Sequence, residues 1–389
     1  MNEIISLMNG DISGWMCSGN DEAVTTVVFE NLLYAAAEQR FVQVVIATEE
    51  MFPKVSQIVE ADSKNKGYIP SDTYRYFPVF SGKNVDMRER IFEIIKRCQV
   101  DSDKADEVMT YIDFLTELET GIGAENQVEN EMFLQKYLRV SDVEKALTTA
   151  MENDEITSEE YGDLIADYSD CSSGRIQLKR ILNRLDRCFS LKKERCISVS
   201  SLDEGARLCF VIKPDMNVDM KELLFEMIGW DILDARRNGK QVSLMVLEGC
   251  KKYGNELLQL LNVSATDISF NFITKDYFSG HTAEWSEKID EYFHRYIYTS
   301  HLRMESCEEI SSKRFGQIPV VRNSYACDRD RRISNNRVLD RLLDTNRVDH
   351  YVQHVPIWEP QYRKEEIHDM QEGMCLVQTD NFEGYVNFC

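Results

Sequence analysis

The sequence predicts an α/β fold in which a mostly parallel sheet is interrupted by an all-helical insert. Short apolar runs rich in β-branched residues, such as residues 41–47 and 242–247, indicate strands that are buried on both faces, as in parallel sheets. Helical periodicities alternate with these runs, which is typical of a sheet covered by helices on both faces. Residues 85–195, by contrast, show helical patterns and no convincing strand.

The length of the chain sets the domain organisation that we expect. Its 389 residues suffice for one large core or for a core with a second domain. We expect residues 1–84 and 196–389 to form the α/β domain, and residues 85–195 to form an acidic all-α insert.

The first part of the chain reads as strand, turn, helix and strand. Residues 21–39 predict a helix because apolar side chains recur there at helical spacing, and the run 41–47 predicts the following strand. Within the insert we expect helices at residues 85–98, 103–120, 140–152, 157–168 and 174–189.

The alternation of strands and helices resumes after the insert. We expect strands at residues 208–212, 242–247, 268–273 and 294–303. We expect helices at residues 220–238, 256–261, 283–292 and 304–315. Gly316 follows the last of these helices, at the position where glycine commonly ends a helix.

Composition excludes several classes of protein. The longest apolar runs fall far short of the ~20 residues that a membrane span needs. The first 13 residues carry Glu3 and Asp11 and no basic region, so they do not read as a secretory signal. The 11 cysteines form no CxxC pair, which indicates reduced thiols in the cytoplasm. Cysteines and histidines are never grouped at ligand spacing, so we expect no structural metal.

Charge is distributed unevenly along the chain, whose net charge is −22. Residues 101–170 hold 20 Asp or Glu against 4 Lys or Arg, whereas residues 313–347 hold 9 Lys or Arg against 4 Asp. An acidic protein binds nucleic acid only through a segregated basic patch. The candidates for such a patch are Arg329, Arg331, Arg332 and Arg337. The alternative is a solvated loop followed by a helix surface.

A second candidate site is the segment Gly14–Asp21, which has the glycine spacing of a phosphate-binding loop and precedes a helix. In a working loop, the second glycine is followed by a lysine that reaches the phosphates and by a Ser or Thr that holds magnesium. Here Asn20 and Asp21 stand at those positions, so we expect nucleotide affinity to be weak. The residues of this degenerate loop are Gly14, Ser18, Gly19, Asn20 and Asp21. An ordinary glycine turn is the alternative.

A third candidate site follows the predicted strand 242–247, where an Asp-Glu pair would hold magnesium and polarise water. Only Glu248 is present, so either Leu247 stands in place of the metal-holding Asp or Gly249 in place of the catalytic Glu. Either replacement impairs hydrolysis. The alternative is a core strand that ends in an acidic turn.

In the order of its segments, the chain resembles the cytoplasmic part of type IV secretion coupling proteins, the TraG/TraD kind of conjugative DNA-transfer ATPases. These proteins are RecA-like, FtsK-related motors with a P-loop NTPase fold. The segments that carry the resemblance are Gly14–Asp21, Asn31–Ala37, Val42–Glu50, 85–195, Glu204–Pro214, Leu223–Arg237, Gln241–Gly249, Ile268–Lys275, Tyr296–Gly316 and Tyr351–Val377. Thr274 or Lys275 stands where the family has a sensor glutamine, and the family's N-terminal membrane helices are absent.

The resemblance implies a RecA-like sheet with an inserted all-α domain that faces transfer substrates or accessory proteins. Because the diagnostic residues are replaced, we expect a pseudo-ATPase without a bound cofactor, located in the cytoplasm or peripheral to the membrane through its partners. We expect it to form homo- or hetero-oligomers and to contact protein partners through residues 101–170. Two alternatives remain. One is a working motor that binds Mg-ATP, uses Glu248 as base and takes a cation from a neighbouring subunit's Arg331 or Arg332. The other is an unrelated α/β protein-binding module.

Overall fold

The computed structural model divides into two units, Met1–Ser300 with Gln371–Cys389, and His301–Met370. The residues that it describes are 3–8, 11–51, 53, 55, 65–68, 75–76, 84–98, 101–121, 138–185, 196–213, 216–249, 252–264, 268–329 and 348–387.

A nine-stranded sheet organises the first unit, in the order β13-β12-β9-β1-β8-β7-β2-β6-β3. The strands from β9 to β3 in that order pair in parallel, whereas β12 pairs antiparallel with both β9 and β13. The strands are β1 (Trp15–Ser18), β2 (Val42–Thr48), β3 (Asn65–Tyr68), β6 (Arg207–Ile212), β7 (Val242–Glu248), β8 (Ser269–Thr274), β9 (Arg295–Thr299), β12 (Met374–Gln378) and β13 (Glu383–Asn387).

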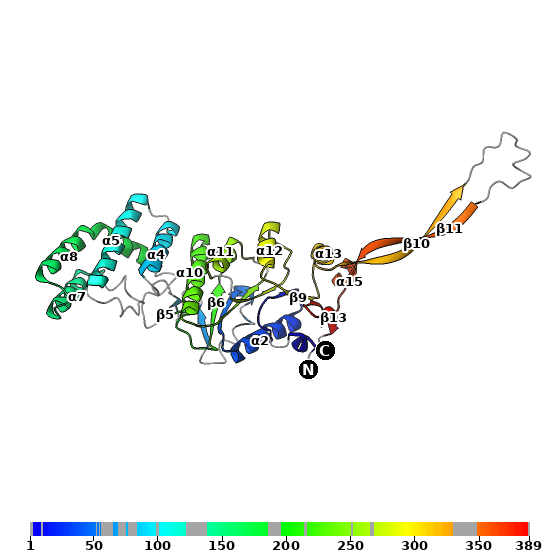
Figure 1. Ribbon diagram of the computed structural model, residues 1–389, viewed down its shortest axis with the longest axis horizontal. Coiled ribbons are helices and arrows are strands. Elements are labelled where there is room, and N and C mark those ends of the chain that lie inside the picture. Colours follow the sequence, from blue (N-terminus) through cyan, green and yellow to red (C-terminus); the bar gives the residue numbers. More distant parts are fainter. Residues whose placement is uncertain are drawn as a thin grey trace, which may run out of the picture. The chain divides into compact units, whose positions relative to one another are not determined.

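Helices cover both faces of this sheet, as the continuous apolar strands predict. Helix α2 lies on one face, and α10, α11 and α12 lie toward the other (Figure 1). Phe29 and Leu32 of α2 join Val45 of β2 and Met245 of β7 in one buried cluster. The helices are α1 (Glu3–Met8), α2 (Glu22–Glu38), α10 (Val218–Arg237), α11 (Asn255–Ser264) and α12 (Ala283–Asp290), with a 3-10 turn η1 (Glu49–Met51) after β2.

Every described element between β4 (Arg75–Tyr76) and β5 (Cys196–Ile197) is a helix, and these two short strands pair with each other in parallel. Gly174 allows two of these helices to approach closely, because a Cβ there would lie 2.0 Å from the Glu107 carbonyl oxygen. The helices are α4 (Asn84–Arg97), α5 (Ser102–Gly121), α7 (Val140–Glu152), α8 (Ser158–Asp170) and α9 (Ser172–Leu185).

The second unit contains a long antiparallel hairpin, β10 (Gln317–Arg329) with β11 (Val348–Pro360). Helices α13 (Met304–Lys313) and α15 (Lys364–His368) flank it in the sequence. The interpretation of residues 313–347 as a loop followed by a helix surface is therefore wrong for residues 317–329, which form a strand.

Most predicted elements of the sheet and the insert are confirmed within a few residues at each end. Two differences matter for function. The strand expected before the glycine segment lies inside it, at β1, and residues 3–8 are helical instead. The segment Tyr351–Val377 resembles the family's final strand pair, but the two strands that pair at the end of the chain are β12 and β13, which begin at Met374. Among the described residues, no helix has the length and apolar character to cross a membrane.

Candidate functional site

The carboxyl edge of the parallel sheet brings together residues from two of the candidate sites and from the expected sensor position. Ser18 at the end of β1 pairs with Thr274 of β8, and Thr274 in turn pairs with Glu248 at the end of β7. Open α/β sheets bind their ligands outside this edge. Ser18, Thr274 and Glu248 therefore lie side by side at the place where a nucleotide site of this fold class belongs.

The segment Gly14–Asp21 does not form a single loop. Gly14 and Gly19 lie at opposite ends of β1, so the connection from β1 to α2 consists of Gly19, Asn20 and Asp21. Gly19 has a φ of +143°, and a Cβ there would lie 2.0 Å from the Thr299 hydroxyl oxygen. The close approach of β9 therefore explains this glycine without any phosphate.

The carboxylate of Asp21 caps the N-terminus of α2. Its Oδ1 accepts hydrogen bonds from the backbone N–H groups of Ala23 and Val24, both at 3.1 Å. Its Oδ2 accepts a hydrogen bond of 2.7 Å from the N–H of Gly373, just before β12. Asp21 is only 6% exposed. A negative group belongs at this position because the helix dipole and the unpaired amides attract it, and here the chain supplies that group itself.

The space left beside this cap is small. A cavity of about 90 Å³ lies between the β1–α2 connection and the ends of β8 and η1. Pockets for small-molecule ligands usually measure about 300–1,000 Å³. The lining residues are Gly19, Asn20, Glu22, Thr25, Met51, Ile273, Thr274 and Lys275.

Glu248 is fully buried and is held by the side chains of Lys252 and His281. Its Oε2 lies 3.2 Å from Lys252 Nζ and 2.9 Å from His281 Nε2, and its Oε1 accepts a hydrogen bond from the N–H of Tyr253. His281 also stacks on Trp285, with ring centroids 3.6 Å apart. A carboxylate with these partners is fixed as part of the core.

Lys252 extends the same network, because its Nζ donates to Thr274 Oγ1 at 2.7 Å and to the Asp276 carbonyl oxygen at 2.8 Å. Burial, reinforced by the charge of Glu248, raises the pKa of the Tyr253 hydroxyl well above its usual value. These two partners of Glu248 were not predicted. The spacing of Lys252 four residues after Glu248 offers a weak signal, whereas nothing local marks His281.

Other side chains pack against Leu247 and Gly249, the two neighbours of Glu248 in the sequence. A Cβ at Gly249 would lie 1.6 Å from Oε1 of Glu50, whose side chain covers this glycine. Leu247 is buried in the cluster beneath α2. A second carboxylate at Gly249 would require the flexible side chain of Glu50 to move, and one at Leu247 would lie in the apolar core. Lys275, one of the two residues at the expected sensor position, lies 3.9 Å from Glu50 Oε2.

The candidate nucleic-acid residues lie mostly outside the described part of the chain. Arg329 ends β10, and its side chain is outside the described residues, as are Arg331, Arg332 and Arg337. Their role stays a prediction. Within the described ranges, no group of three or more His, Cys, Asp or Glu side chains is arranged to hold a metal ion.

Comparison with solved structures identifies the fold. The chain is similar to the bacterial conjugative coupling protein TrwBdeltaN70 in complex with sulphate, at 12% identity and a TM-score of 0.51, over 98% of this chain and 86% of that chain. The unbound form of that protein gives the same identity and TM-score, over 98% and 85%. VirB4 of Thermoanaerobacter pseudethanolicus is also similar, at 9% identity and a TM-score of 0.47, over 97% of this chain and 89% of that chain.

No protein-family model and no curated protein matches the chain. The likeness to the coupling protein therefore establishes the fold: a RecA-like, P-loop NTPase-type sheet, as the segment order predicted.

Proposed function

We propose that this chain is a RecA-like relative of conjugative coupling ATPases that does not hydrolyse ATP. It acts by assembling with proteins of a DNA-transfer or type IV secretion system. The observation that carries the proposal is the carboxylate of Asp21, which takes the helix amides that a phosphate would use.

A nucleotide at this place meets a direct electrostatic penalty. A phosphate at ~5 Å from one carboxylate costs roughly 3 kcal/mol at an effective dielectric constant of about 20. Glu22 brings a second carboxylate nearby, in the lining of the small cavity beside the cap. The three-residue connection from β1 to α2 leaves no extended run of backbone amides to offset that repulsion.

Glu248 supports the same conclusion from the other half of the site. To hold Mg²⁺ or to polarise water, its carboxylate would have to leave Lys252 and His281. Separating a buried carboxylate from its cationic partner Lys252 is strongly unfavourable.

The role in assembly rests on the fold and on charge. TrwB is a conjugative coupling protein, and the helical region of this chain carries most of its negative charge, at residues 101–170. Charge complementarity favours a basic protein as the partner of that surface over nucleic acid. The proposal includes a cytoplasmic location and assembly into a homo- or hetero-oligomer beside an active motor.

One observation favours a working motor as the second candidate. Ser18, Thr274 and Glu248 keep the placement of an active site across neighbouring strands. In that case Glu248 is the base, and Arg331 or Arg332 of a neighbouring subunit supplies the missing cation. The third reading, an unrelated α/β binding module, does not fit the RecA-like fold.

Titration calorimetry with Mg-ATP and a phosphate-release assay test the proposal. We expect neither saturable binding nor turnover. The double variant Asn20→Lys/Asp21→Thr restores the residue types of a working loop, and it should still not bind because the connection stays too short. Glu248→Gln should change nothing, whereas in a working motor it abolishes turnover. Micromolar binding with turnover that Glu248→Gln removes would refute the proposal.

A further inference from the structure

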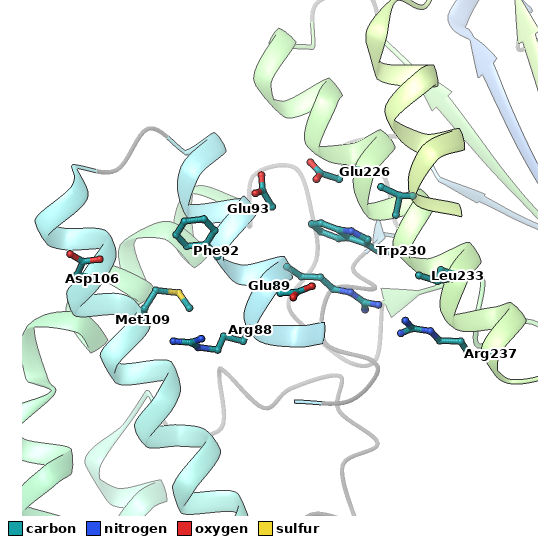
Figure 2. A pocket seen from close by; sticks show the side chains of 12 residues that line it. Arg88, Glu89, Phe92, Glu93, Asp106, Met109, Glu226, Trp230, Leu233 and Arg237 are labelled. Carbon is teal, nitrogen blue, oxygen red and sulfur yellow. The ribbon is translucent and has the colours of Figure 1, made fainter. Parts of the chain in front are cut away.

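A groove of about 650 Å³ lies where α4, α5 and α10 meet, away from the carboxyl edge of the sheet. In Figure 2, α4 lies between α5 and α10, with Phe92 on the side of α5 and Trp230 reaching from α10 toward α4. The groove thus crosses the joint between the helical insert and the core.

The groove has an apolar and aromatic floor. Phe92 is 48% exposed, which is high for a phenylalanine, and Trp230 is 9% exposed. Met109 of α5 and Leu233 of α10 extend the apolar lining on either side (Figure 2). An exposed apolar patch with a polar rim is typical of a binding surface.

The cations in the lining already have carboxylate partners. Arg88 pairs with Asp113, with nitrogen–oxygen distances of 2.6 and 3.0 Å. Arg90 pairs with the buried Asp234 at 2.7 and 2.8 Å. Arg237 also lies within 3.8 Å of Asp234.

The carboxylates in the lining are less well matched. Among the described residues, neither Glu89 nor Asp106 has an ion-pair partner, and both are exposed. Oε2 of Glu226 is buried without a hydrogen bond, with Arg97 Nε at 3.6 Å. The charge that remains available to a ligand in the groove is therefore negative.

We propose that this groove binds a basic segment of a protein partner, with an arginine or lysine side chain held between the carboxylates and the aromatic rings. Phe92 and Glu93 lie three and four residues after Glu89 on α4, so both lie on the same helix face as Glu89. Carboxylates beside aromatic faces are the surroundings that a guanidinium or ammonium group prefers. The acidic insert attracts such a partner from a distance and repels nucleic acid.

This inference deepens the proposed function, since it rests on the view that the chain works through protein partners. It does not depend on the state of the nucleotide site. Peptide binding is measured without nucleotide, so ATP turnover would overturn the proposed function and leave the groove untouched.

The test measures, by titration calorimetry, how tightly the full chain binds a short amphipathic peptide with arginine and leucine on one face. A second peptide carries citrulline, which keeps the shape of arginine without its charge. We expect the Glu89→Gln/Asp106→Asn variant to weaken binding of the arginine peptide at least about tenfold, which corresponds to ~1.4 kcal/mol. Phe92→Ala should also weaken it.

The matched control is Glu159→Gln/Asp163→Asn, which removes two exposed carboxylates from α8 in the same insert. It should leave affinity within about twofold, and circular dichroism should show that all variants are folded. Equal losses in the groove and control variants, equal binding of the citrulline peptide, or no saturable binding would overturn the proposal. So would spermidine or a labelled oligonucleotide competing as well as the arginine peptide.

Discussion

At the scale of single residues, Asp21 caps the N-terminus of α2 with its own carboxylate. Its two carboxylate oxygens join the first turn of α2 to the N–H of Gly373, which lies 352 positions later in the chain. The group is buried beside Cys375, and burial together with the charge of Asp21 raises the pKa of that thiol to about 12. This thiol therefore stays neutral at physiological pH.

Asp21→Ala removes the helix cap and leaves three backbone amides without an acceptor. We expect the free energy of unfolding to fall by about 0.5–2 kcal/mol, the usual range for loss of a helix cap. Urea denaturation followed by circular dichroism measures this change. Glu22→Gln, next to the cap and exposed, is the control, and it should have little effect. An Asp21→Ala chain as stable as the original would show that the cap contributes nothing.

At the scale of elements, the buried ion pair of Arg90 with Asp234 joins α4 to α10. Both side chains are about as buried as core residues, at 4% and 5% exposure, and Arg90 also lies over the Trp230 ring. Arg97 of α4 adds a second pair with Glu222 of α10. These contacts fix the start of the helical insert to the core.

Asp234→Ala leaves the buried Arg90 guanidinium without its partner. We expect a loss of about 3–5 kcal/mol in the free energy of unfolding, as for other broken buried pairs. Asp113→Ala breaks the exposed pair with Arg88 and should cost only ~0–1 kcal/mol. Thermal and chemical denaturation compare the two variants. Similar losses for both would contradict the role given to burial.

Strand β10 of the hairpin β10–β11 was not predicted from the sequence. Residues 313–347 were interpreted from their charge, and the partner strand begins only at Val348. A strand in a two-stranded hairpin is defined by its pairing, because side-chain alternation alone is a weak signal for it. The strands of the main sheet were easier to predict, since burial on both faces makes them continuously apolar.

At the scale of the whole molecule, the net charge of −22 opposes contact with nucleic acid. We expect no saturable binding of a labelled single-stranded oligonucleotide at physiological salt, because phosphate contacts weaken steeply as salt rises. Fluorescence anisotropy measures this. Binding that disappears when Arg329, Arg331, Arg332 and Arg337 are changed to Gln would contradict the expectation and assign the basic segment to nucleic acid.

For most elements of the main sheet and of the helical insert, the order of strands and helices follows from the sequence alone, because each of these elements has its own apolar period. The apolar run 242–247 predicts a strand, and the helical periodicities within residues 85–195 predict the helices of the insert. The sequence also shows Asn20 directly after Gly19, and Glu248 as the single carboxylate at the end of the run 242–247. Their interpretation as a degenerate nucleotide site stays a prediction.

Only the tertiary structure decided what the remaining site residues do. The partners of Asp21 and Glu248 come from positions far away in the chain, at Gly373 and His281. The placement of β1 within the glycine segment depends on pairing with β8 and β9. Local periodicity indicates which face of an element is buried, whereas long-range contacts determine which groups a side chain on that element contacts. The internal cap of α2 could therefore not be read from residues 14–21.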